Sequence, residues 1–235
     1  MKKKTALAAL LLAAACVFSG CGADKTLYRE MESLQKQAVT LESGIITLTV
    51  QFEESGAPGE YAAELTFKQT ENGAYAYCQK QFDQNEQIVF CEYSDGTQTK
   101  QWLVGRGWGG TGGAQVTKET PHRYLQMISS PYERKMIQSI EKEEDENGVR
   151  YILAMNASRV SKTCYPDGAF TVSEQTVTLT FDTEGKLTGY SENTILKQGD
   201  SDAENSYRVD LYCKEHNAVE KIEAPQLRER FGQAK

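Results

Sequence analysis

The chain has 235 residues, with 26 basic and 33 acidic side chains and a formal net charge of −7 at pH 7. An acidic chain is a poor partner for nucleic acid, because phosphate binding needs clustered cations. It also gains nothing from general attraction to an anionic bilayer. We therefore expect no nucleic-acid partner, and the length is enough for a sizeable core in one large or two small domains.

The first 20 residues have the three parts of a secretory signal peptide. Lysines at positions 2–4 give a positive start, an apolar run follows over 6–17, and small residues then precede Cys21. The apolar run is about 12 residues long, whereas a bilayer-spanning helix needs about 18 or more. We therefore predict a cleaved signal rather than a transmembrane helix.

The end of this segment, Phe18-Ser19-Gly20-Cys21, resembles the lipobox of bacterial lipoproteins. In that family the cysteine becomes the first mature residue and carries acyl chains, so the resemblance implies lipid attachment at Cys21. Losing the signal would remove three lysines and change the net charge from −7 to −10. There are two alternatives to cleavage and lipidation at Cys21. The signal peptide is cleaved before Cys16 instead, or the segment is a plain secretion signal and Cys21 is incidental.

The chain after Cys21 begins with a predicted helix and continues as an antiparallel meander. Apolar residues recur at steps of three and four from Leu27 to Leu41, which predicts an amphipathic helix over 25–43. Period-two alternation and short turns then predict consecutive strands. These strands cover 46–52, 61–67, 74–82, 87–94 and 97–104.

The third hairpin of the meander allows a prediction about cysteines. If its loop is two residues long, Cys78 stands directly opposite Cys91 in a non-hydrogen-bonded pair. Such pairs bring the Cα atoms to about 4.5 Å, which is within disulfide range. An exported chain with four remaining cysteines favours bridges, so we expect Cys78–Cys91 and, by elimination, Cys164–Cys213. The alternative is small buried thiols.

The middle of the chain predicts a loop and two helices. Residues 105–114 are rich in glycine but lack the Gly-Lys-Ser/Thr ending of a phosphate-binding loop, so we predict a loop without a nucleotide site. A helix is predicted over 120–128. A Ser-Pro-Tyr-Glu capping box with proline at the first helical position predicts a second helix over 130–142.

Strands resume after these helices. Period-two alternation predicts strands over 149–157, 169–181, 186–196 and 207–213, and the tail after Pro225 predicts a frayed helix. The connections are short, and there is neither a repeat nor an obvious linker. The sequence therefore predicts a signal peptide over 1–20 and a single α+β domain over 21–235.

Signals for catalysis are few. His122 and His216 are far apart and in no ligand spacing, the cysteines form no C-x-x-C pattern, and there is no Gly-x-Ser-x-Gly nucleophile motif. We therefore predict no enzyme activity, no metal site and no cofactor. An envelope hydrolase that uses two carboxylates is the alternative.

The segment from Lys100 to Lys135 has a net charge of +4 within an acidic chain and holds both tryptophans. Cations beside tryptophan are typical of a membrane interface or the mouth of a lipid pocket. We therefore hypothesise a mobile lid that faces headgroups or an anionic lipid ligand. The alternative is a solvated helix face with two core aromatics. The candidate lid and ligand residues are Trp102, Arg106, Trp108, Arg123, Tyr132 and Arg134.

The order of the elements resembles the lipoprotein-carrier (LolA-like) proteins and the lipid-binding lipoproteins of that superfamily. The resemblance is carried by the N-terminal helix, the meander, the inserted helices, the later strands and the closing pattern Tyr-x-Val-x-Leu-Tyr … Val-Glu-Lys-Ile-Glu-Ala-Pro over 207–225. It implies a large curved antiparallel sheet, an unclosed half-barrel, around an apolar cavity that is closed by helices and takes acyl chains.

These observations predict a lipoprotein that is anchored on the extracytoplasmic face of the bacterial cell membrane and binds a lipid or other hydrophobic ligand. The alternative is a non-catalytic interaction or regulatory lipoprotein of the same fold that docks an envelope protein partner. A transporter's solute-binding protein is disfavoured, because such proteins need alternating βα units and more length.

Overall fold

The structure is a computed structural model that describes most of the chain beyond the predicted signal peptide. The signal peptide and Cys21 lie outside the described residues. In the part that is described, no helix combines the length and the apolar composition needed to cross a membrane. The described residues are 23–38, 41–54, 56–111, 119–129, 132–199 and 203–227.

These residues form long strands and a few short helices. The helices are α2 (Lys25–Ala38), α3 (Glu119–Ser129) and α4 (Ala157–Cys164), with a 3-10 turn η2 (Arg134–Met136) between α3 and α4. The strands are β1 (Ser43–Glu54), β2 (Ala57–Gln69), β3 (Tyr75–Phe82), β4 (Ile88–Asp95), β5 (Thr99–Leu103), β6 (Gly107–Thr111), β7 (Ile137–Asp145), β8 (Gly148–Met155), β9 (Phe170–Asp182), β10 (Leu187–Gln198) and β11 (Glu204–Lys214).

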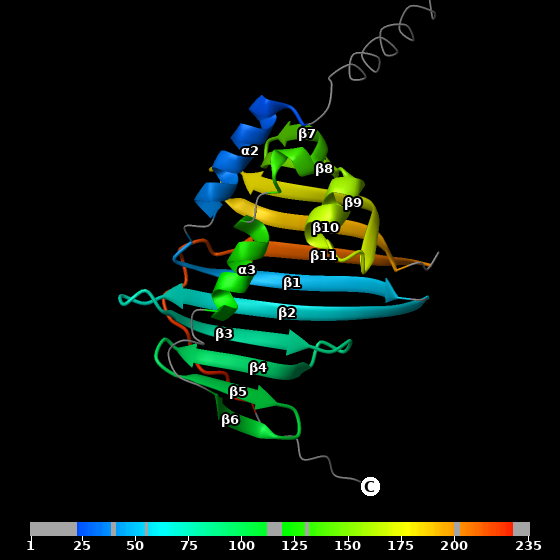
Figure 1. The fold of residues 1–235 in the computed structure, drawn as a ribbon. Helices are drawn as coiled ribbons and strands as arrows, with labels where there is room; N and C mark the ends of the chain where they lie inside the picture. Colours follow the sequence, from blue (N-terminus) through cyan, green and yellow to red (C-terminus); the bar gives the residue numbers. More distant parts are fainter. Residues whose placement is uncertain are drawn as a thin grey trace, which may run out of the picture.

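One antiparallel sheet holds all the described strands (Figure 1). Its 11 strands follow the order β6-β5-β4-β3-β2-β1-β11-β10-β9-β8-β7. The edge strands β6 and β7 do not pair with each other, so the sheet stays open. The predicted α+β fold with a large, curved and unclosed antiparallel sheet is therefore confirmed.

The path of the chain explains why helices are inserted midway. Strands β1 to β6 step from the centre of the sheet to one edge, and β7 to β11 step back from the opposite edge until β11 pairs with β1. The chain must cross the sheet between β6 and β7, and α3 lies over the middle of one face on this crossing (Figure 1). We call the face covered by the helices the inner face and the opposite one the outer face.

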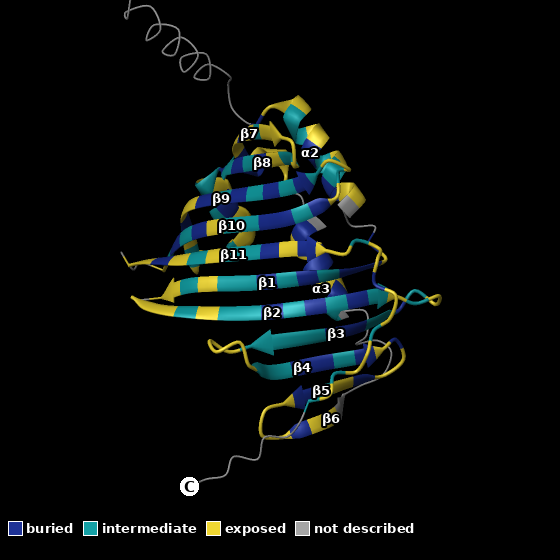
Figure 2. Cartoon of the chain, turned by 180° about the vertical axis from the view of Figure 1, so that it is seen from behind, coloured by how far each residue is buried: buried dark blue, intermediate teal, exposed yellow. Residues whose placement is uncertain are grey.

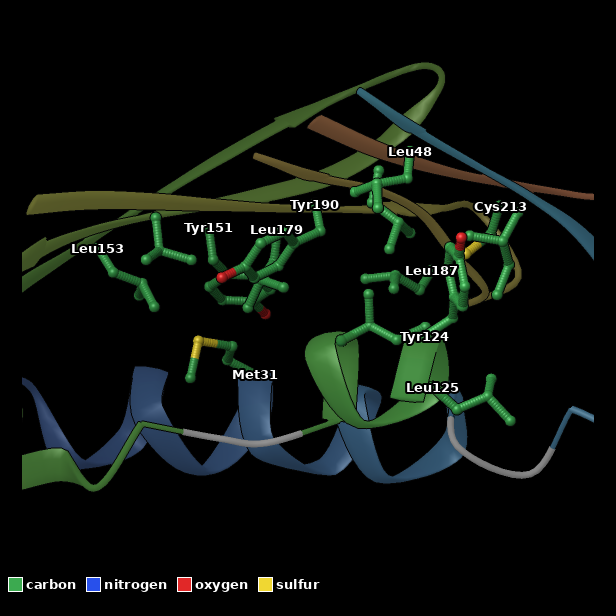
Figure 3. Packing of buried hydrophobic residues seen from close by; sticks show 14 of the residues in the cluster. Met31, Leu48, Tyr124, Leu125, Tyr151, Leu153, Leu179, Leu187, Tyr190 and Cys213 are labelled. Carbon is green, nitrogen blue, oxygen red and sulfur yellow. The ribbon is translucent and has the colours of Figure 1, made fainter. Parts of the chain in front are cut away.

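The main core fills the space between the helices and the inner face (Figure 3). Met31 of α2 and Leu125 of α3 are almost fully buried there, and Met31 points toward strand residues such as Tyr151 and Leu153. Burial of each large apolar side chain contributes about 1.5–3 kcal/mol. The region beneath α2 and α3 is thus filled by the protein's own side chains.

Two polar contacts also hold α3 on the sheet. The hydroxyl of Thr120 donates to Glu92 Oε1 of β4 over 2.7 Å, and Gln79 Nε2 of β3 donates to the hydroxyl of Tyr124 over 2.9 Å. Glu92 is only 6% exposed, so its hydrogen bonds matter for the stability of this contact. They fix the position of α3 along the strands.

A smaller core lies on the outer face. Cys78, Cys91 and Trp102 form it on β3, β4 and β5, and Ile222 and Leu227 from the segment after β11 pack against them. The back view in Figure 2 shows the outer face, where buried positions on β4, β5 and β6 lie beside this C-terminal segment. The frayed helix predicted after Pro225 is not present over the described residues 225–227, which are irregular.

Two predicted elements of the middle segment are wrong. Part of the predicted glycine-rich loop forms the edge strand β6, in which Trp108 pairs with Trp102 of β5. The helix predicted over 130–142 is absent from the described residues 132–142, which form η2 and the first part of β7. Pairing of β7 with β8 supplies its backbone hydrogen bonds, and this tertiary pairing outweighs the local helix signal.

Helix α4 was not predicted. Its N-cap is Asn156, whose side chain accepts a hydrogen bond from the backbone amide of Arg159 over 3.1 Å. Val160 is buried and holds the helix against the sheet. The cap residue is the sequence signal that could have revealed this helix, because asparagine is one of the preferred N-cap residues.

The predicted register of the β3–β4 hairpin is also wrong. Cys78 stands opposite Tyr93, and Cys91 stands opposite Lys80, so the two cysteines are diagonal neighbours. The last pair before the turn is Phe82 with Ile88, so the turn is longer than two residues, and a register shift separates this pair from Gln81 with Phe90. Within the turn, Asp83 Oδ1 accepts hydrogen bonds from two backbone amides. Diagonal residues lie about 7–8 Å apart at Cα, which is beyond the usual disulfide range.

The four described cysteines are free thiols, so neither predicted bridge is formed. The sulfur atoms of Cys78 and Cys91 lie 3.7 Å apart. Cys164 is exposed at the end of α4, whereas Cys213 is buried in the main core. Burial raises the pKa of the Cys213 thiol to about 12, so this thiol stays protonated at neutral pH.

Candidate ligand-binding site

The helices bury only part of the inner face. On β1, Leu48 is buried, whereas Val50 and Phe52 further along the strand are half-buried. Val209 and Tyr207 of β11 stand opposite Val50 and Phe52, and they are half-buried too. We call Val50, Phe52, Tyr207 and Val209 the apolar strip. Partly accessible apolar side chains on the inner face are the surface that a hydrophobic ligand requires.

A cavity of about 180 Å³ adjoins this strip. Its walls come from the end of α4 and from three neighbouring strands, and its lining consists of Tyr165, Phe170, Glu192, Thr194, Leu196 and Tyr207. A second, open hollow of about 610 Å³ lies at the ends of β1, β2, β10 and β11 and shares Thr194 and Tyr207 with the cavity. We call the smaller space the α4 cavity.

Aromatic rings form much of the wall of the α4 cavity. Tyr165 follows α4 directly, and its ring meets that of Phe170 edge to face, with 5.3 Å between the centroids. Tyr207 stacks on Phe52 with a centroid distance of 6.5 Å. Such aromatic pairs are stabilising beyond the area that they bury. They also keep the two tyrosine rings in place around the cavity.

Glu192 of β10 supplies the charged group of the α4 cavity. Its Oε2 accepts hydrogen bonds from the hydroxyls of Tyr132, over 2.7 Å, and Tyr190. Its Oε1 accepts from Gln175 Nε2 over 2.7 Å and from the hydroxyl of Thr194 over 2.9 Å. A carboxylate offers about four acceptor positions, so these four neutral donors use them all.

The surroundings keep the donating tyrosines protonated. Burial and then the charge of Glu192 raise the pKa of Tyr132. Burial, with Tyr132 and Glu192 as further causes, also raises the pKa of Tyr190. In the lining of the cavity, the hydrogen bond from Tyr207 to Glu54 raises the pKa of Tyr207 to about 12. The cavity therefore has one carboxylate in its lining, and a second carboxylate is hydrogen-bonded to the lining residue Tyr207.

The structure does not gather the predicted lid residues into one surface. Trp102 is buried on the outer face, Trp108 lies opposite it on the edge strand, and Arg106 is exposed in the turn between β5 and β6. These three residues are on β5, β6 and the turn between them, away from the α4 cavity. The single lid that the sequence suggested is therefore not formed by them.

The other three predicted residues also have separate surroundings. Arg123 is exposed on α3, and Arg134 Nε donates to the carbonyl of Ala23 over 2.8 Å. Tyr132 alone contacts the α4 cavity, through its hydrogen bond to Glu192. A ligand role for Tyr132 stays a prediction.

The remaining candidate groups for chemistry are dispersed. No group of three or more histidine, cysteine, aspartate or glutamate residues in the described part of the chain could hold a metal ion. His122 is exposed on α3, and His216 Nε2 lies 2.7 Å from the carbonyl of Leu187. The α4 cavity itself is formed by aromatic rings and one hydrogen-bonded carboxylate.

Solved structures with a similar course of the chain include bacterial lipoproteins. LprF from Mycobacterium bovis matches with a TM-score of 0.49 and 14% identity, over 88% of this chain and 99% of that chain. The lipoprotein LppX from Mycobacterium tuberculosis matches with a TM-score of 0.47 and 13% identity, over 85% of this chain and 100% of that chain.

A LolA superfamily protein from Nitrosomonas europaea matches with a TM-score of 0.28 and 10% identity, over 78% of this chain and 92% of that chain. The matches thus include a lipoprotein and a protein of the LolA superfamily. No family model matches the sequence. No curated protein matches it either.

Proposed function

We propose that this protein is an envelope lipoprotein, anchored through Cys21 after cleavage of residues 1–20, whose single domain binds a hydrophobic ligand on the inner face of its half-barrel. The proposed role is binding rather than catalysis, and it requires no cofactor. The observation that carries the proposal is the apolar strip beside the α4 cavity, where the helices leave the inner face partly accessible.

A charge placed on the apolar strip tests ligand binding. Val209→Glu is expected to weaken binding of the neutral hydrophobic probe N-phenyl-1-naphthylamine at least tenfold, because a carboxylate in an apolar site is poorly solvated. Fluorescence titration of the purified chain measures the dissociation constant. The control is Tyr212→Glu, since Tyr212 is on the same strand, lies on the outer face and is 52% exposed.

Equal affinities of the two variants would contradict a site on the inner face. Native mass spectrometry after gentle purification gives an independent measurement, because a bound acyl compound adds its mass to the chain. Thermal unfolding of both variants shows whether any loss of binding reflects loss of the fold.

The anchor is tested separately. Cys21→Ser is expected to move the protein from the membrane fraction to the soluble fraction, because stable anchoring depends on the acyl chains rather than on charge. Cys164→Ser is the matched control and should stay with the membrane, and a Cys21→Ser protein that also stays would contradict the proposal. Ala23 is buried and held by Arg134, so an acylated Cys21 would leave one residue between the anchor and the folded body.

A second candidate function is docking of an envelope protein partner. Leu103 at the end of β5, Val104 in the turn that follows and Trp108 on β6 are 40%, 58% and 39% exposed. Leu103 pairs with Gly107 and Trp108 with Trp102, so both faces of this sheet edge carry an exposed apolar group that a partner could cover. An empty protein that co-purifies with one stoichiometric partner would favour this function over ligand binding.

A further inference from the structure

Among the described residues, no cation forms an ion pair with the carboxylate of the α4 cavity. None of the ion pairs within the described residues includes Glu192, and the hydrogen bonds that it accepts come from hydroxyls and an amide. The nearby guanidinium of Arg208 in the larger hollow is engaged by Asp210, with Nε 2.6 Å from Oδ2. The cavity thus has a negative charge that its own walls do not neutralise.

The influence of this charge extends to other residues near the cavity. Burial and then the charge of Glu192 raise the pKa of Cys164. Burial, then Cys164 and then Glu192 raise the pKa of Tyr165. Glu54 adds a second negative charge, hydrogen-bonded to the lining residue Tyr207. An anionic headgroup would be repelled here, whereas a cation would gain Coulomb energy in a partly desolvated space.

The hydrogen bonding of Glu192 restricts which cation fits. A primary ammonium carries three donors that need acceptors. The four donors already on the carboxylate leave it no free acceptor position. A quaternary ammonium carries no donor, so it can gain from the charge without displacing any of these bonds.

The aromatic walls of the α4 cavity also suit a quaternary ammonium group. Tyr165, Phe170 and Tyr207 line it together with the carboxylate. Faces of aromatic rings attract cations by about 0.5–2 kcal/mol, and aromatic cages are the usual means of binding quaternary ammonium ligands. The volume of about 180 Å³ suits a headgroup rather than a long chain, and the adjacent apolar strip could accept the chain.

We infer that the α4 cavity binds the quaternary ammonium group of a cationic or zwitterionic amphiphile, with Glu192 providing the charge and the aromatic rings the contact surface. This inference rests on the proposed function, since the apolar part of the same ligand lies on the apolar strip. The α4 cavity would thus select ligands that have a quaternary ammonium headgroup.

The test uses four probes with the same ten-carbon chain and different heads: decyltrimethylammonium, decylammonium, decanol and decyl sulfate. Each is titrated calorimetrically, below its micelle concentration, into the chain that carries Cys21→Ser and keeps every described residue. Decyltrimethylammonium should bind at least tenfold more tightly than decanol and decylammonium, and decyl sulfate should bind most weakly. Glu192→Gln should weaken the trimethylammonium probe about tenfold and leave the decanol affinity unchanged.

The outcomes separate the inference from the proposed function. If the four probes bind equally, if decylammonium binds as tightly as the trimethyl probe, or if Glu192→Gln changes nothing, the inference is overturned and ligand binding stands. If none of the four probes binds, the proposed function falls.

A second variant covers the case in which Glu192→Gln does not fold. Tyr165→Leu keeps an apolar wall but removes an aromatic face, so the trimethylammonium affinity should fall about fivefold while the decanol affinity stays the same. Tyr212→Leu, on the exposed outer face, is the matched control and should change neither affinity. An unchanged trimethylammonium affinity in Tyr165→Leu would overturn the inference.

Discussion

Replacing Leu125 with alanine is expected to lower the free energy of unfolding by about 3 kcal/mol, since leucine-to-alanine changes in protein cores cost about 2–5 kcal/mol. Leu125 of α3 is 2% exposed and belongs to the main core. Its neighbours in the core are large side chains that can close the resulting space only in part. Urea unfolding followed by circular dichroism measures the change.

Met127→Ala is the matched control, because Met127 lies on the same helix and is 39% exposed. It should change the free energy of unfolding by less than about 0.5 kcal/mol, as surface substitutions usually do. Equal losses in the two variants would contradict the packing of α3 on the inner face. A normal value for Leu125→Ala would contradict it too.

The alternating strands could be predicted because each has one face in a core. On β1, Ile46 and Leu48 point to the helices, whereas the residues between them do not, so the period of two is written in the sequence. The sheet order follows from short antiparallel connections on both sides of one helical crossing. The pattern of the sequence was therefore sufficient to predict the fold class correctly.

The elements that were missed depend on partners that local patterns do not reveal. Strand β6 contains three glycines, which weaken a strand on their own, but pairing with β5 supplies its hydrogen bonds. The register of β3 and β4 follows from a turn longer than two residues and from an irregularity in the pairing between Gln81 and Phe82, and the apolar pattern reveals neither. Because the pairing of the two strands is shifted, Cys78 stands opposite Tyr93 and not opposite Cys91.

The candidate site could not be predicted for a related reason. Tyr132 and Glu192 are 60 residues apart in the sequence and meet only because β10 lies beneath the segment before η2. Tyr165 reaches the cavity from α4, a helix that the sequence did not predict. Each of these residues is unremarkable in its own segment, so only the tertiary structure shows that a carboxylate and several rings share one cavity.

Gly148→Ala is expected to destabilise the fold by more than about 3 kcal/mol, since it combines a backbone clash with strain at a special backbone angle. Gly148 begins β8 with a φ of +142°, which L residues rarely adopt. An added Cβ would overlap the carbonyl oxygen of Phe181 and lie 2.8 Å from Asp182 Cα, both on the paired strand β9. Backbone atoms cannot rotate away, so the two strands would have to separate.

Thermal unfolding of the purified variants measures this effect, with Gly73→Ala as the matched control. Gly73 also has a positive φ, +76°, but nothing lies within 4 Å of the Cβ that would be added. Its substitution should therefore cost only the backbone strain, about 1–2 kcal/mol. A much larger loss for Gly148→Ala shows that close contact between β8 and β9 holds the sheet together at this point. Equal losses would mean that strain alone determines both, and that the strands can adjust to the extra methyl group.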